Sequence, residues 1–201
     1  MTTRRRPWRQ PAALLTVALL TLTGCSFGTH TTPPSETKVP SPAIPSPLNT
    51  SKFTADPCAA LTSDQLIGIG FASASIEPGR VGACNMKTGR TSGVSISYQP
   101  EYFRSLYSLY GRHAQGFDTG NHWEELSINS YPAVLIAIEE NVGSHRDKGP
   151  LSCSLALGID DATMVTIRTN TYEDSSAGPW QYDPCGATKK VAAFVVDNLR
   201  A

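Results

Sequence analysis

Two kinds of apolar spacing occur in the chain after residue 53. Residues 94–98 alternate apolar side chains with serines, a period of two that is typical of a half-buried strand. Residues 101–113 have a helical spacing instead, and the apolar residues that follow it are Phe103, Leu106, Tyr107 and Tyr110. This second pattern predicts a helix with one apolar stripe that packs against a core.

The same reasoning assigns the other segments of the domain. We expect strands at residues 81–87, 94–98, 123–128, 131–140, 151–158 and 163–169. We expect helices at residues 57–61, 63–69, 101–113 and 184–199. In the strand at 131–140, Val134, Ile136 and Ile138 are expected to share one face. Most connections are too short for parallel crossovers, so we expect an α+β fold: a mainly antiparallel sheet of about six strands with helices packed on it.

Three helix starts are marked by capping residues. Asp56-Pro57-Cys58 and Asp183-Pro184-Cys185 each combine a strong N-cap with a proline suited to the first helical position. Thr62 and Gln65 have the spacing of a capping box. These signals predict that Cys58 and Cys185 lie in first helical turns.

The N-terminus has the pattern of an export signal. Arginines at positions 4, 5, 6 and 9 precede an apolar run at 12–23, which is short against the roughly 20 residues that a membrane-spanning helix needs. Leu22-Thr23-Gly24-Cys25 then has the pattern of a bacterial lipoprotein processing site. We therefore expect residues 1–24 to be a signal peptide and Cys25 to carry lipid, with the mature protein on the extracytoplasmic side of the cell membrane.

Composition divides the mature chain into a tether and one domain. Residues 25–52 are rich in Pro, Ser and Thr and predict a disordered tether, whereas residues 53–201 are long enough for one folded domain. All 17 acidic residues and 13 of the 17 basic residues follow Cys25, so the mature chain carries a charge near −4. This balance excludes the electrostatic signature of a nucleic-acid-binding protein, and leaves lipidated Cys25 as the expected membrane contact.

Four more cysteines predict two disulfides in an exported domain. They are Cys58, Cys84, Cys153 and Cys185. A structural zinc site is the alternative, but no two of them have the close spacing that such sites use. Four cysteines allow three pairings. We favour Cys58–Cys84 and Cys153–Cys185, because each clips a helix start to the nearest cysteine-bearing strand.

These motifs together resemble a family of exported actinobacterial lipoproteins that share a domain of unknown function. The resemblance is carried by the processing site, the tether, Asp56-Pro57-Cys58-Ala59-Ala60-Leu61-Thr62, Cys84, Cys153 and Asp183-Pro184-Cys185. Met86 departs from it, since such sequences often have Trp two residues after the strand cysteine. The resemblance implies location and fold but no reaction. A similar layout in extracellular sensor domains of actinobacterial receptor kinases suggests ligand sensing.

Residues that would specify a reaction are not found. Nucleophile elbows, zinc-protease motifs and phosphate-binding glycine loops are absent from the sequence, so we expect no enzyme activity and no cofactor. A metal site at His113, Asp118 and His122 is conceivable, although the spacing matches no familiar ligand set, and we predict none. Trp180 and Tyr182 lie in a Gly/Pro loop and are candidate ligand or partner contacts.

Three function classes therefore remain open. The preferred one is a non-enzymatic domain that binds or senses an unidentified small molecule. A structural or assembly partner of another envelope protein is the first alternative. A cell-envelope hydrolase without a recognisable motif is the second.

Overall fold

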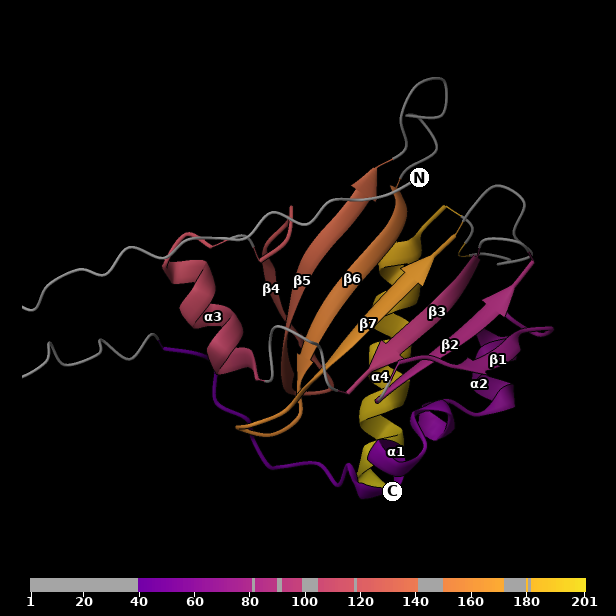
Figure 1. Ribbon diagram of the computed structural model, residues 1–201, viewed down its shortest axis with the longest axis horizontal. Coiled ribbons are helices and arrows are strands. Elements are labelled where there is room, and N and C mark those ends of the chain that lie inside the picture. The colour runs from indigo at the N-terminus through magenta and orange to yellow at the C-terminus, as the bar shows by residue number, and fades with distance from the viewer. Residues whose placement is uncertain are drawn as a thin grey trace, which may run out of the picture. The chain divides into compact units, whose positions relative to one another are not determined.

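The protein folds around one antiparallel sheet (Figure 1). The structure is a computed structural model that describes residues 40–80, 82–89, 92–98, 105–117, 119–140, 150–171, 180 and 182–201. All of these belong to the compact unit formed by residues 37–201. The described strands follow the order β1-β2-β3-β7-β6-β5-β4, and each neighbouring pair is antiparallel.

The sheet contains seven described strands, one more than the sequence predicts. They are β1 (Ser75–Pro78), β2 (Ala83–Thr88), β3 (Ser92–Ser97), β4 (Glu124–Ile128), β5 (Tyr131–Glu140), β6 (Pro150–Gly158) and β7 (Met164–Asn170). The additional strand is β1, an edge strand whose four residues are all exposed. It therefore lacks the alternation of buried and exposed residues by which the other strands are predicted.

In the described part of the chain, four α-helices and one 3-10 turn accompany the sheet. They are α1 (Ser51–Ala55), the turn η1 (Pro57–Ala60), α2 (Ser63–Gly68), α3 (Leu106–Ala114) and α4 (Pro184–Arg200). The α+β class and the mainly antiparallel sheet are as predicted, whereas α1 spans the expected boundary between tether and domain, where the sequence predicts no helix. No helix in the described part of the chain is long and apolar enough to cross a membrane.

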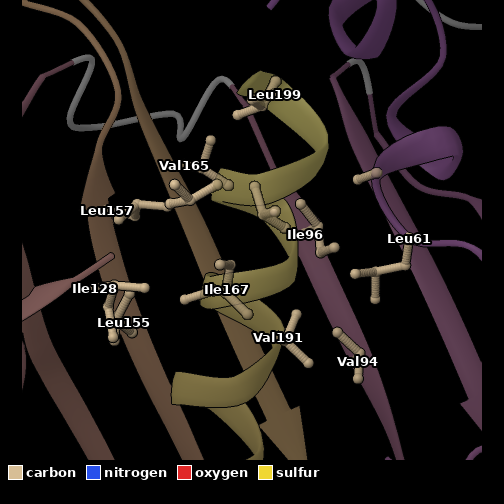
Figure 2. Close-up of a cluster of buried hydrophobic side chains, with 14 of the residues drawn as sticks. Leu61, Val94, Ile96, Ile128, Leu155, Leu157, Val165, Ile167, Val191 and Leu199 are labelled. Atoms are coloured by element: carbon tan, nitrogen blue, oxygen red, sulfur yellow. The ribbon is translucent and has the colours of Figure 1, made fainter. Parts of the chain in front are cut away.

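The larger core lies between α4 and one face of the sheet. Val191, Val195 and Leu199 recur along one side of α4 and are at most 3% exposed. Figure 2 shows the apolar side chains of β3, β6 and β7 around this helix, among them Ile96, Leu155 and Ile167. Full burial of each such side chain contributes about 1.5–3 kcal/mol, so α4 is a main source of stability.

The opposite face carries a smaller core beneath α3. Leu106, Leu109 and Tyr110 of α3 pack against Val134 of β5, and Ala156 and Met164 complete the cluster. The other end of this face is polar, with serines, threonines and asparagines on the outward positions of β3, β6 and β7. Thus α3 covers only part of this face among the residues that the structure describes.

The predicted helix starts are confirmed. The Asp56 carboxylate accepts the Cys58 N–H at 3.1 Å, and the Asp183 carboxylate accepts the Gly186 N–H at 2.7 Å. Thr62 and Gln65 form the expected reciprocal capping box. Each carboxylate thus satisfies a backbone donor that the first turn of a helix leaves without a partner.

The favoured pairing of the cysteines is also confirmed. Cys58 bonds to Cys84, and Cys153 bonds to Cys185, with Cα atoms 5.0 Å apart in both pairs. The first pair fixes η1 to β2, and the second fixes the start of α4 to β6. In the chain-entropy model, loops of this length correspond to about 3–4 kcal/mol of stabilisation each.

Two details of side-chain placement were predicted incorrectly. A register shift lies between Leu135 and Ala137, and beyond it Ile138 packs with the α4 core, whereas Val134 packs with the α3 core. The three residues expected on one face are therefore divided, because a bulge exchanges the faces of a strand. Tyr107, expected in the buried stripe of α3, is 43% exposed, and Leu109 is buried instead.

Residues 41–49, which we call the strap, also differ from the prediction. The sequence predicts a tether that extends to residue 52, whereas the strap lies along one end of the sheet, between α3 and α1 (Figure 1). Leu48 is 7% exposed, and its N–H donates to the carbonyl of Ile159 at 3.0 Å. The Tyr131 hydroxyl donates to the Ser46 carbonyl at 2.9 Å. The folded domain therefore begins before residue 53.

This placement of the strap predicts a cost for truncating Leu48. Leu48→Ala removes a buried side chain, so it should lower the free energy of unfolding by about 2 kcal/mol or more. The matched control is Ile67→Ala, which truncates a side chain that is 56% exposed and should change stability by less than about 0.5 kcal/mol. Urea midpoints of the mature chain measure both, and equal midpoints for Leu48→Ala and the parent would contradict the docked strap.

Candidate functional site

The strap separates two hollows at its end of the sheet. One, which we call the acidic groove, has a volume of about 440 Å³ and is lined by Ser41, Pro42, Ile44, Leu106, Tyr107, Asp160 and Asp161. The other, which we call the arginine groove, has a volume of about 370 Å³ and is lined by Pro45–Asn49, Ser130, Tyr131, Leu199 and Arg200. Both volumes fall in the range of small-molecule sites.

Three separate segments build the acidic groove. The strap contributes Ile44, the first turn of α3 contributes Leu106 and Tyr107, and the turn between β6 and β7 contributes Asp160 and Asp161. The lining thus combines aliphatic surface, an aromatic ring and two carboxylates, and it contains no cationic side chain.

Gly158 permits these segments to meet. A Cβ atom on this residue would lie 2.5 Å from Leu106 Cδ1 and 2.7 Å from Ile44 Cδ1, which is closer than carbon atoms approach. The strap and α3 therefore share the space above the last residue of β6.

Local hydrogen bonds fix the walls of the acidic groove. Ser105 and Ser108 form a capping box that begins α3 directly before Leu106 and Tyr107. In the turn, the Asp160 carboxylate accepts the Ala162 N–H at 2.7 Å. Asp160 thus has a structural bond within its own turn, and the exposed Asp161 follows it at the rim.

The arginine groove is bordered by internal bonds of the Arg200 side chain. The Arg200 guanidinium donates to the Asn129 carbonyl at 2.6 Å and lies 5.2 Å from the centre of the Tyr131 ring. Asn129 and Ser130 have positive φ angles of 47° and 74°, which form the tight turn between β4 and β5. Because its lining includes Arg200 and no acidic residue, this groove has a charge opposite to that of the acidic groove.

Two of the three residues considered for a metal site, His113 and His122, lie in the described part of the chain. The His113 ring stacks on Trp123 at 3.7 Å between ring centres, and its Nδ1 lies 3.2 Å from the Thr119 hydroxyl. His122 Nε2 lies 3.6 Å from a Glu124 oxygen. Asp118 lies outside the described residues. Within the described part of the chain, no three His, Cys, Asp or Glu side chains are grouped closely enough to hold a metal ion.

A polar network occupies the exposed end of the sheet face that carries α3. The Arg168 guanidinium donates to the Glu139 carboxylate at 2.8 Å and to the side-chain amide oxygen Oδ1 of Asn170 at 2.9 Å. Ser152, which is 3% exposed, donates to the same Glu139 oxygen at 2.9 Å. The polar groups of Arg168, Glu139 and Ser152 therefore satisfy one another.

Trp180 and Tyr182, the candidate contacts from the sequence, do not line either groove. Trp180 is half-buried and packs with the α4 core, close to Gly186. Tyr182 is 56% exposed. Most of the loop before them lies outside the described residues, so their role as ligand contacts stays a prediction.

The residues of the acidic groove were not identified as a site from the sequence. Asp160 and Asp161 were interpreted as a hairpin turn, and residues 41–44 as tether. One signal was present: Ile44 and Leu48 are large apolar residues, four positions apart, in a segment otherwise rich in Pro and Ser. Such a pair indicates contact with a core.

Comparison with known families gives one match. The family described as "Protein of unknown function (DUF3558)" matches the chain over residues 20–198, which is most of its length. Comparisons with curated proteins and with solved structures give no match. Neither the family description nor these comparisons assign a ligand or a reaction.

Two buried tyrosines, Tyr110 of α3 and Tyr98, predict how the stability of the protein responds to alkaline pH. Burial, followed by the nearby Glu125 carboxylate, raises the pKa of the Tyr110 phenol above its usual range, and burial does the same to the pKa of Tyr98. The folded state thus favours the neutral phenols. Their contribution to stability is complete below a pH of about 10, the ordinary tyrosine pKa, and is lost as the pH rises above it.

Tyr110→Phe should reduce this alkaline loss of stability. The Tyr110 hydroxyl lies near the Glu125 carboxylate but makes no hydrogen bond of good geometry among the described residues, so the variant should match the parent at neutral pH within about 1 kcal/mol. The control is Tyr182→Phe at an exposed position. Urea midpoints at neutral and alkaline pH measure the effect, and identical pH profiles for Tyr110→Phe and the parent would show the account of Tyr110 to be wrong.

Proposed function

The chain belongs to the DUF3558 family of proteins of unknown function, and for this member we propose a membrane-anchored envelope lipoprotein whose folded domain binds a small molecule. Cys25 carries the lipid, and the domain lies on the extracytoplasmic side. The observation that carries the binding function is the acidic groove, since it joins apolar surface to a few polar groups, as small-molecule sites do.

The proposed anchor is supported by the order of features at the N-terminus. Four arginines, an apolar run and Leu22-Thr23-Gly24-Cys25 follow one another as in a lipoprotein signal. The family match begins at residue 20 and so includes this processing site. Two confirmed disulfides also suit an oxidising compartment outside the cytoplasm.

The strap links the anchor to the groove in this proposal. Only residues 26–40 then separate the lipid from the packed chain. In an extended polyproline-type conformation, these residues span at most about 50 Å. A ligand in the acidic groove would therefore be held near the membrane surface.

An assembly partner is the second candidate, and β1 is the observation that favours it. This edge strand is exposed throughout, and Ile76 on it is 49% exposed. An exposed edge can pair with a strand of another chain. We rank this second because β1 has only four residues and ends at Pro78, which cannot donate a backbone hydrogen bond.

A cell-envelope hydrolase receives less support. Neither groove has a histidine or a cysteine in its lining, and the carboxylates of the acidic groove are adjacent in one turn. One of them already accepts a backbone hydrogen bond. The lining offers binding contacts rather than a nucleophile with its base.

Loss of the acylated cysteine should abolish membrane attachment. Cys25→Ser removes the thiol that would carry the acyl chains, so the protein should leave the detergent phase or keep its signal peptide. Phase partitioning and intact mass measure this, with Cys58→Ser, which removes a disulfide cysteine, as the control that should stay membrane-bound. Unchanged partition of Cys25→Ser, with an intact mass showing that the signal peptide has been removed, would refute the anchor.

Binding itself is tested on the protein extracted from its own membrane. Native mass spectrometry should show the folded chain with a bound small molecule, which dissociates when the chain is denatured. The same protein refolded from denaturant supplies the ligand-free reference mass. A chain that is always bare, or that is recovered only with a second protein, would contradict the binding function.

A further inference from the structure

We propose that the acidic groove binds an organic cation with an apolar body, such as an amine or quaternary ammonium on a hydrocarbon group; this rests on the ligand-binding function proposed above. The inference names the chemical class of the ligand. It follows from the charge, the ring and the aliphatic surface that the groove brings together.

The carboxylates of the groove favour a ligand with a positive charge. Asp160 and Asp161 are two carboxylates at one rim, and no lysine or arginine lines the groove. One Asp160 oxygen accepts the Ala162 N–H, which orients the carboxylate but leaves its negative charge. A cation would gain from both carboxylates, whereas an anion would be repelled by them.

The aromatic ring and the aliphatic residues of the groove favour a ligand that also carries a hydrocarbon group. Pro42 and Ile44 supply most of the aliphatic surface, because Leu106, which also lines the groove, is only 3% exposed. Tyr107 also lines the groove and is 43% exposed overall, and an aromatic ring attracts a cation over its face. A bare metal ion would make no apolar contact with this surface.

The exposed position of Tyr107 fits this role. The helical stripe predicts a buried residue here, yet the side chain lies at a groove that also holds two carboxylates. The strap completes the site, since Pro42 and Ile44 line it together with the turn. Ligand binding and docking of the strap should therefore stabilise each other.

The arginine groove supplies an internal control. It lies on the same strap and has a similar volume, but it is lined by Arg200 instead of acids. A probe that binds merely because it is apolar should affect both grooves. A probe that binds through the proposed chemistry should affect only the acidic groove.

The experiment uses the full mature chain with Cys25→Ser, which omits the lipid, and a matched pair of probes. Phenethylammonium carries the cation, and 3-phenylpropionate has a similar size with a negative charge. NMR titration should show saturable shifts at Tyr107 and Asp161 with the ammonium probe, at roughly millimolar affinity. Added salt should weaken this binding. Equal shifts with both probes, or shifts at Arg200 alone, would overturn the proposal.

Substitutions at the groove distinguish the effect of its charge on binding from an effect on folding. Asp161→Asn should weaken binding of the ammonium probe about three- to tenfold, and Tyr107→Leu about two- to fivefold. Asp64→Asn on α2 is the matched control, because it removes an exposed acid that does not line the groove, and it should bind the probe like the parent. Unchanged binding by Asp161→Asn, with an unchanged amide spectrum, would refute the assignment.

The two proposals fail in different ways. Suppose that a small molecule co-purifies with the chain but slows hydrogen exchange only at residues away from Tyr107 and Asp161. This result would overturn the cation site and leave the binding function intact. A chain that has no co-purified molecule and does not bind the ammonium probe would overturn both.

Discussion

The packing of the strap and α3 over Gly158 is the interaction on which the groove end of the domain depends. Ile44 of the strap and Leu106 of α3 occupy the space that a Cβ atom would fill. This contact brings together two segments that are 62 residues apart along the chain. Around it, Leu48 pairs with Ile159, and Tyr107 and Asp161 come to line one groove.

Much of the fold could be predicted because its signals are local. The carboxylates of Asp56 and Asp183 cap helices as their position before proline indicates. Alternating residues in β3 and β7 bury Ile96 and Ile167 on the α4 side. The disulfide pairing followed from the same elements, because a cysteine in a first helical turn can reach only a strand that packs beside it.

The rest depended on contacts that local patterns do not specify. A bulge after Leu135 placed Ile138 with the α4 core, and nothing in the alternation of β5 indicates where a residue is inserted. β1 is exposed, so it shows no apolar period. The composition of the strap is that of a linker, and only Ile44 and Leu48 supply the burial that holds it. The groove was missed for the same reason, since its walls meet only in the folded chain.

The strap is thus part of the folded domain and lines the acidic groove. Hydrogen exchange at the Leu48 amide tests this placement most directly, because this N–H donates to the Ile159 carbonyl. The account predicts that the amide exchanges at least about a hundredfold more slowly than an unstructured peptide of the same sequence. Exchange at the peptide rate, in a domain whose β6 amides remain protected, would contradict it.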